Sequence, residues 1–191
     1  MTHVDVMRSE TIRCRPERWL DLVLDVHQYA AVDDKMGPIK WVRRDGDLTE
    51  FRFTPRLPGL RLPQPAIVSQ MRLVPGERID VVLAPLPRNL SSRVVVRFRA
   101  SFSCAAVPGG VRVTRMMSFR FAPPMRWLVE PVLRRTLPVS VERELRLAKQ
   151  LLESDGATWE GAPREGPRGR RPSDRSRVVQ GSGRIHDLGC V

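Results

Sequence analysis

The sequence predicts an α+β fold in which one long helix near the C-terminus packs on a curved antiparallel sheet. Two observations support this prediction. Within residues 125–153, apolar side chains recur at helical spacing, at Val141, Leu145, Ala148 and Leu152. The chain before this segment alternates apolar and polar residues with a period of two, in stretches divided by turn residues. A helix with one apolar stripe needs a surface to cover, and a sheet provides it.

The helical segment contains two prolines, Pro131 and Pro138. Because proline has no backbone N–H to donate inside a helix, we expect a shorter helix over 125–135, a kink or break, and a main helix that begins near Pro138. The charged residues of the main helix are expected mostly on its other faces: Glu142, Arg143, Glu144, Arg146 and Lys149.

Toward the N-terminus, residues 4–12 are predicted as the first strand. A helix follows, because Pro16 suits the first helical position and Glu17 places a negative charge near the positive helix end. Residues 29–38 are predicted as a short irregular connection with room for a second helical turn.

Six further strands are predicted from the period of two, in the ranges 39–43, 48–54, 67–73, 79–83, 91–106 and 111–121. The loop at 55–65 is rich in proline and therefore cannot be a strand, yet it carries three leucines. An apolar loop of this kind is predicted to pack as a flap over the rest of the domain.

Arg115 is the sharpest candidate for a functional residue. It shares the parity of Val111, Val113 and Met117, so the alternation places it in the core unless a bulge near Met116 shifts the register. A buried guanidinium needs a carboxylate, carbonyl groups, water or a ligand. The simple alternative is an arginine at a cavity mouth that reaches solvent or pairs with Glu50 or Asp80.

The composition, with 191 residues and 41% hydrophobic content, predicts one globular domain over residues 1–153. Residues 154–191 consist largely of Gly, Pro, Arg, Ser and Asp, which predicts a disordered tail. The sequence has no apolar run of about 18 residues and no secretory signal at its start, so we expect a cytoplasmic protein. Three separated cysteines and the absence of ligand motifs predict no disulfide framework, no metal site and no cofactor.

The formal net charge of +12 raises nucleic acid and anionic membranes as partners. Nearly all of this charge is arginine, which is typical of a high-GC bacterial genome. The aromatic residues lie on the core parity and do not interleave with the arginines, which argues against nucleic acid. The outward arginines either contact an acidic membrane or protein or form a solvated face: Arg93, Arg97, Arg99, Arg112 and Arg120.

Pro16-Glu17-Arg18-Trp19 opens the first helix, Tyr29 follows it, and residues 145–153 end the long helix. This order of elements resembles that of the SRPBCC superfamily. This START-like or Bet v 1-like group includes polyketide cyclase/dehydrase and lipid-transport proteins. The resemblance implies a helix-grip fold, in which a curved antiparallel sheet of about six or seven strands wraps around the C-terminal helix and encloses a deep hydrophobic cavity. It does not imply one reaction.

Inward parity and the helix stripe then predict the residues of such a cavity. The ligand-binding candidates are Trp41, Phe51, Phe53, Ser69, Met71, Phe98, Phe102, Arg115, Met117, Phe119, Trp127, Val141 and Leu145. Three functions remain open: a carrier of a hydrophobic small molecule or lipid, a polyketide aromatase/cyclase, and a basic interaction protein. In a cyclase, Arg115 and Tyr29 would be the catalytic candidates, because together they could polarise a ketone and stabilise an enolate.

Overall fold

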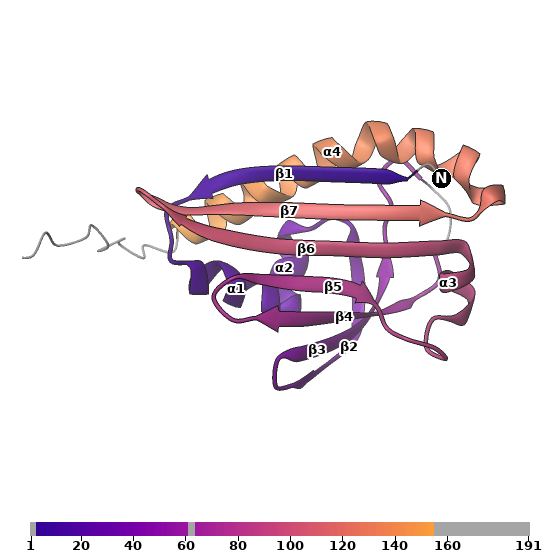
Figure 1. Cartoon of the computed structure of the whole chain (residues 1–191), viewed down its shortest axis with the longest axis horizontal. Helices are drawn as coiled ribbons and strands as arrows, with labels where there is room; N and C mark the ends of the chain where they lie inside the picture. The colour runs from indigo at the N-terminus through magenta and orange to yellow at the C-terminus, as the bar shows by residue number, and fades with distance from the viewer. Residues whose placement is uncertain (1–2, 61–63, 155–191) are drawn as a thin grey trace, which may run out of the picture.

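The computed structural model describes residues 3–60 and 64–154, with the side chains of Ser91, Arg93 and Pro124 left aside. Figure 1 shows the arrangement of its strands and helices. Seven strands form one antiparallel sheet in the order β1-β7-β6-β5-β4-β3-β2. The strands are β1 (Val4–Ile12), β2 (Met36–Asp45), β3 (Leu48–Pro55), β4 (Ile67–Val74), β5 (Arg78–Leu83), β6 (Val96–Val107) and β7 (Gly110–Phe121). The helices are α1 (Pro16–Leu24), α2 (Val26–Val32), α3 (Leu90–Val95) and α4 (Pro123–Ser154).

The long helix α4 runs along the edge of the sheet formed by β1 and β7 (Figure 1). Its predicted apolar stripe, Val141, Leu145, Ala148 and Leu152, is buried, and the buried stripe also includes Leu133 and Leu137. The chain therefore has the helix-grip arrangement of a curved antiparallel sheet and a long C-terminal helix. The predicted tail, apart from Ser154, lies outside the described residues.

Helix α4 also corrects two expectations. It continues through Pro131 and Pro138, so the predicted break is wrong. The prolines leave the carbonyl groups of Trp127 and Arg134 without their helical donors, and both of these residues are exposed, so water can satisfy those carbonyls. Glu144 was expected mostly on the outer faces, but it is 1% exposed and points into the domain.

The short helices α1 and α2 cover another part of the inner face of the sheet. Helix α2 is the second helical turn that the sequence allowed, but it begins earlier than expected, at Val26. The side chain of Asp25 caps it by accepting bonds from the backbone N–H groups of His27 and Gln28. The Tyr29 ring then lies edge-on to Phe102, with ring centroids 5.1 Å apart. This packing fixes Tyr29 against strand β6.

Two strands differ locally from the prediction. The strand expected from residue 91 begins at Val96, because residues 90–95 form helix α3, where Val94 is 72% exposed. In β2, the register shifts twice before Trp41, so that Trp41 pairs with Arg52 instead of continuing the inward parity. Strand β7 has no such irregularity, and the pairs Arg115 to Phe102 and Arg115 to Arg8 lie in unbroken registers. The predicted inward position of Arg115 is correct.

Candidate functional site

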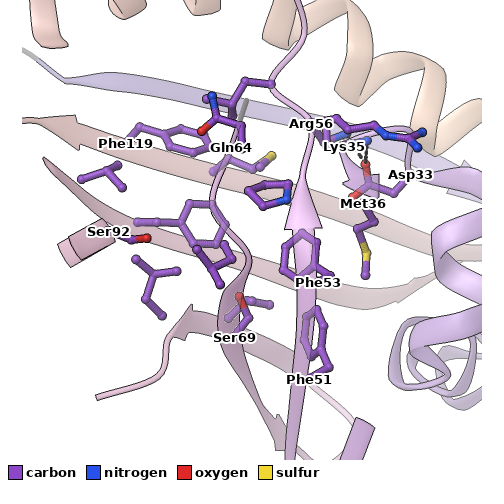
Figure 2. A pocket seen from close by; sticks show the side chains of 18 of the residues that line it. Asp33, Lys35, Met36, Phe51, Phe53, Arg56, Gln64, Ser69, Ser92 and Phe119 are labelled. Atoms are coloured by element: carbon purple, nitrogen blue, oxygen red, sulfur yellow. Dashed lines mark hydrogen bonds and ion pairs between the residues drawn. The ribbon is translucent and has the colours of Figure 1, made fainter. Parts of the chain in front are cut away.

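A cavity of about 370 Å³ lies on the inner face of the sheet, over strands β3 to β7. Its walls are mostly apolar. The loop after β3 forms part of the rim with Leu57 and Pro65, and the end of α3 contributes Val95. Among the described residues of α4, Met125 alone reaches the lining. Figure 2 shows Phe51 and Phe53 projecting from β3 into this space, with Ser69 on the neighbouring strand.

Most of the predicted cavity residues do line the cavity. They are Phe51, Phe53, Ser69, Met71, Phe98, Phe102, Arg115, Met117 and Phe119, together with the catalytic candidate Tyr29. The strands bring them together because inward residues alternate along each strand and are in register across the sheet. Their predicted role in ligand binding is taken up below as a proposal.

Four predicted residues lie elsewhere. Trp41 faces outward because of the irregular register of β2, and the Arg43 guanidinium lies 5.1 Å from the centre of its ring. Trp127 is 76% exposed on the outside of α4. Val141 and Leu145 are buried in the core, away from the cavity lining. The cavity is therefore bounded mainly by sheet, α2–β2 corner and rim loop, while α4 fills the space beside it.

The proline-rich loop packs as the sequence suggested. The Thr136 hydroxyl of α4 donates a hydrogen bond to the carbonyl oxygen of Pro58, at 2.8 Å. Gly59 has a φ of +78° and lies so close to α4 that a Cβ there would come within 2.8 Å of Val132 Cγ1. The loop is thus held against the helix beside the cavity. Leu62, one of its three leucines, falls in 61–63, outside the described residues.

The polar end of the cavity is built around Arg115. Its side chain is 4% exposed, and its guanidinium lies 3.7 Å from the centre of the Phe102 ring. Arg115 Nε donates to Glu144 Oε1 at 3.2 Å. The alternative of a pair with Glu50 or Asp80 at the cavity mouth is wrong, because Glu50 bonds to Gln70 and Arg88 while Asp80 pairs with Arg78. The partner is instead a buried carboxylate supplied by α4.

Glu144 connects three elements. Its side chain is 0% exposed; Oε1 also accepts the Tyr29 hydroxyl, and Oε2 accepts Lys35 Nζ at 2.6 Å. Lys35 Nζ reaches Asp33 Oδ1 at 2.7 Å and the Ser140 hydroxyl at 3.3 Å. Figure 2 shows the Asp33–Lys35 pair at one side of the cavity, near Met36 and Arg56. We call Tyr29, Asp33, Lys35, Arg115 and Glu144 the buried polar cluster.

Burial and charge act in opposite directions on the ionisable groups of this cluster. Burial and the Glu144 charge raise the pKa of Asp33 to about 6, although Lys35 and Arg115 oppose the shift. Burial alone would raise the pKa of Glu144, but Arg115 and Lys35 outweigh it and hold that pKa below its ordinary value. Burial, followed by the Glu144 charge, raises the pKa of Tyr29, so its hydroxyl keeps its proton. At neutral pH the cluster therefore holds two cations, two carboxylates and a neutral phenol.

Three members of the buried polar cluster were missed from the sequence: Asp33, Lys35 and Glu144. A signal for Glu144 existed, because it lies seven residues after Leu137 and three after Val141, on the same stripe of the helix. Asp33 and Lys35 carried no comparable periodic signal. Tyr29, Asp33, Lys35 and Arg115 line the cavity, whereas Glu144 lies behind them.

Other features of the described residues bear on the function. They contain no cluster of three or more His, Cys, Asp or Glu side chains that could hold a metal ion. No helix within 3–60 and 64–154 is long and apolar enough to cross a membrane. Of the predicted outward arginines, Arg97, Arg99, Arg112 and Arg120 are exposed, and the side chain of Arg93 lies outside the description.

Comparisons with known proteins agree on one family and one fold. A family described as polyketide cyclase/dehydrase and lipid transport matches residues 3–153. No curated protein sequence matches the chain. Among solved structures, TTHA0849 from Thermus thermophilus is similar over 82% of this chain and 100% of its own, with 14% identity and a TM-score of 0.63.

Two aromatase/cyclase structures are also similar. The Zhui aromatase/cyclase from Streptomyces sp. R1128 has 12% identity and a TM-score of 0.62, over 81% of this chain and 99% of its own. The di-domain StfQ from the steffimycin biosynthetic pathway has 15% identity and a TM-score of 0.62, over 80% of this chain. This chain spans 51% of StfQ. At these identities the likenesses describe the fold alone.

Proposed function

The chain belongs to the polyketide cyclase/dehydrase and lipid transport family, within the SRPBCC superfamily. From that premise we propose that it binds a hydrophobic small molecule or lipid in the cavity on the inner face of the sheet. The observation that carries the proposal is an apolar cavity of about 370 Å³ beside the hydrophobic core of the domain. Pockets of this size, lined by aromatic and aliphatic side chains with a few polar groups, are typical of small-molecule sites.

The arrangement of the buried polar cluster favours binding over turnover. Each carboxylate of the cluster is held by a cation, and the Tyr29 proton is donated to Glu144. Such a network can orient the polar end of a ligand, and it commits the hydrogens of Lys35 and Tyr29 to Asp33, Ser140 and Glu144. We therefore propose a carrier or ligand sensor as the primary function.

Native mass spectrometry of the freshly purified full-length protein, followed by organic extraction, tests this proposal. A carrier is expected to show a stoichiometric extra mass that leaves on denaturation and is recovered in the organic phase. A protein that shows only its apo mass, and binds no added apolar compound, contradicts the proposal.

A cyclase of the aromatase type is the second candidate, because Tyr29 and Arg115 line the same cavity. Arg115 could polarise a ketone directly, and Tyr29 could do so once its hydroxyl turns from Glu144 to the substrate. Replacing Tyr29 with Phe removes one hydroxyl and preserves the ring that packs on Phe102. In a cyclase, this variant is expected to lose turnover of a poly-β-ketone substrate while it still binds the product. A carrier has no turnover to lose, so unchanged binding without any activity in the wild type favours the primary proposal.

A contact with anionic membranes is a further part of the proposal. The chain has no Asp or Glu between Asp80 and Glu130, although this segment holds eight arginines. Helix α3 and the start of α4 lie at the same end of the molecule (Figure 1), where the backbone N–H of Ala122 donates to the carbonyl of Val95. Helix α3 carries exposed Leu90 and Val94, and α4 carries exposed Trp127. Apolar side chains flanked by arginines suit the surface of an anionic bilayer. Co-sedimentation with phosphatidylglycerol vesicles but not with phosphatidylcholine vesicles is the expected result.

The remaining proposals concern the whole chain. We place the ligand-binding domain at residues 1–153 and an Arg/Gly/Pro-rich tail at 154–191, in a cytoplasmic bacterial protein. Deleting residues 155–191 is expected to leave ligand binding unchanged, because Met125 is the last of the described residues that line the cavity. Loss of ligand binding in the truncated protein would contradict this division.

A further inference from the structure

We propose that the polar end of the cavity selects ligands that carry an uncharged hydroxyl or phenol group and discriminates against ligands that carry a carboxylate. This inference rests on the proposed ligand binding and specifies the chemistry of the ligand. It is argued from the charge balance and the hydrogen-bond inventory of the buried polar cluster.

The charges of the cluster cancel at neutral pH. Lys35 and Arg115 supply two positive charges, and Asp33 and Glu144 supply two negative charges. The side chains of all four are at most 7% exposed, so solvent does little to screen an added charge. A carboxylate that entered the cavity would find no unpaired cation at its polar end, and burial of an unpaired charge is costly.

Most hydrogen-bond donors of the cluster are already used. The ammonium group of Lys35 contacts Asp33, Glu144 and Ser140, which matches its three N–H bonds. The hydroxyl of Tyr29 donates its one hydrogen to Glu144. These two residues therefore have no hydrogen left to donate to a ligand.

Two side-chain atoms of the buried polar cluster have no bonding partner among the described residues. Among the described residues, none bonds to Asp33 Oδ2 or to Arg115 Nη2. Three other side-chain atoms of the described residues are fully buried without a hydrogen-bond partner: Trp19 Nε1, Thr49 Oγ1 and Glu130 Oε1. Asp33 Oδ2 and Arg115 Nη2 are not among them. Because both residues line the cavity, a ligand that reaches its polar end meets Asp33 as an acceptor and Arg115 as a donor.

A hydroxyl group complements this pair. It can donate its hydrogen to Asp33 and accept a hydrogen bond from Arg115, and it carries no charge. A carboxylate can only accept, so it would satisfy Arg115 but would lie against the negative charge of Asp33. The cavity therefore favours an alcohol or phenol at this end and an apolar body elsewhere.

Acidification is expected to weaken this selectivity. The groups that face Asp33 are Lys35 from its own segment, Tyr29 from α2, Arg115 from β7 and Glu144 from α4. Because the pKa of Asp33 is raised to about 6, a fall in pH through this value protonates Asp33 and leaves one positive charge uncompensated. A carboxylate ligand then gains an attractive partner, whereas a phenol is little affected.

The experiment compares two ligands of the same shape, 2-naphthol and 2-naphthoate, by isothermal titration calorimetry with the full-length protein. Each keeps one charge state between about pH 5 and pH 7.5, because naphthol remains neutral and naphthoate remains ionised. At about pH 7.5 we expect naphthol to bind at least about tenfold more tightly than naphthoate. At about pH 5 the naphthoate affinity is expected to rise at least several-fold, with little change for naphthol.

Two Asp→Asn variants test whether Asp33 causes the discrimination against naphthoate. In D33N the naphthoate affinity is expected to exceed that of the wild type at pH 7.5 and to lose its pH dependence. Asp45 is an exposed aspartate at the end of strand β2, so D45N is expected to behave like the wild type. The pH dependence of the wild type by itself tests the inference if D33N fails to fold.

Arg56 lies exposed on the cavity rim and is the competing site for a carboxylate. Naphthoate that binds as tightly as naphthol at pH 7.5, and loses that affinity in R56Q, would overturn the inference and leave the proposed ligand binding intact. Displacement of an uncharged apolar probe by both ligands would establish that intact binding. Absence of binding by naphthol, naphthoate and the probe would overturn the inference together with the proposed function.

Discussion

The two halves of the sheet share one pattern of alternating residues but are covered differently. On the β1 side, inward residues such as Val4 and Ile12 meet α4 and are fully buried. Across β3, β4 and β5, inward residues such as Phe51, Met71 and Leu83 face the cavity. A single sheet therefore combines a filled core with an open site. Whether a part of the sheet is filled or open depends on where α4 lies, and the residue pattern of the strands does not show this.

The buried polar cluster joins the two halves, because Glu144 on α4 bonds to Arg115 on β7 and to Lys35 beside β2. Replacing Glu144 with Ala would leave Arg115 buried without its carboxylate and Lys35 with Asp33 as its remaining buried carboxylate. We expect the free energy of unfolding to fall by about 3–5 kcal/mol, measured by urea denaturation. The control is Glu142→Ala, whose 60% exposed side chain pairs only with Arg146 at 3.6 Å, and which is expected to cost less than about 1 kcal/mol. Equal effects of the two variants would contradict a structural role for the cluster.

On the cavity side of the sheet, we expect Asp33 to make the free energy of unfolding depend on pH. Asp33 has its pKa raised to about 6, so the folded state binds its proton more tightly than the unfolded state, whose ordinary value is 3.8. Stability contributed by this group is therefore lowest above about pH 6 and rises as the pH falls toward 3.8. The unfolding free energy of the wild type minus that of Asp33→Asn is expected to increase by up to about 3 kcal/mol over this window. A constant difference across the window would show that Asp33 titrates normally.

A matched pair of truncations compares the halves directly. Leu137 is fully buried in the filled half, whereas Leu83 is buried but lines the cavity. Leu137→Ala is expected to destabilise the fold by about 3 kcal/mol, because a new void replaces contacts on every side. Leu83→Ala is expected to cost about 1–2 kcal/mol less, since one side of Leu83 already faces open space. Urea denaturation measures both values, and a larger cost at Leu83 would indicate that the cavity is closed in solution.

Much of the fold could be predicted because it depends on local periodicity. The alternation in 91–121 placed Arg115 inward, and the stripe from Val141 to Leu152 placed the helix on the sheet. Helix α3 could not be predicted in this way, because Val94-Val95-Val96 has the composition of a strand. The outward turn of Trp41 depends on a register shift, which leaves no mark in the alternation.

The candidate site was predictable only in part. Its apolar lining follows from strand parity, but its polar partners come from distant segments. Lys35 and Glu144 are separated by 109 positions in the sequence, and Arg115 and Glu144 by 29. Such pairings depend on how α4 crosses the sheet. A residue pattern that extends over one element contains no information about the charge that a different element places beside it.

The central claim is that the cavity is open and binds an apolar ligand. The most direct test titrates an uncharged fluorescent probe, N-phenyl-1-naphthylamine, into the wild type, Ser69→Leu and Ser101→Leu. Ser69 lines the cavity, whereas Ser101 lies on the opposite parity of β6 to Phe102, on the outer face of the sheet. The wild type and Ser101→Leu are expected to bind one probe saturably, and Ser69→Leu at least about tenfold more weakly because its side chain occupies the cavity. Equal binding by all three proteins, or none by the wild type, would contradict the claim.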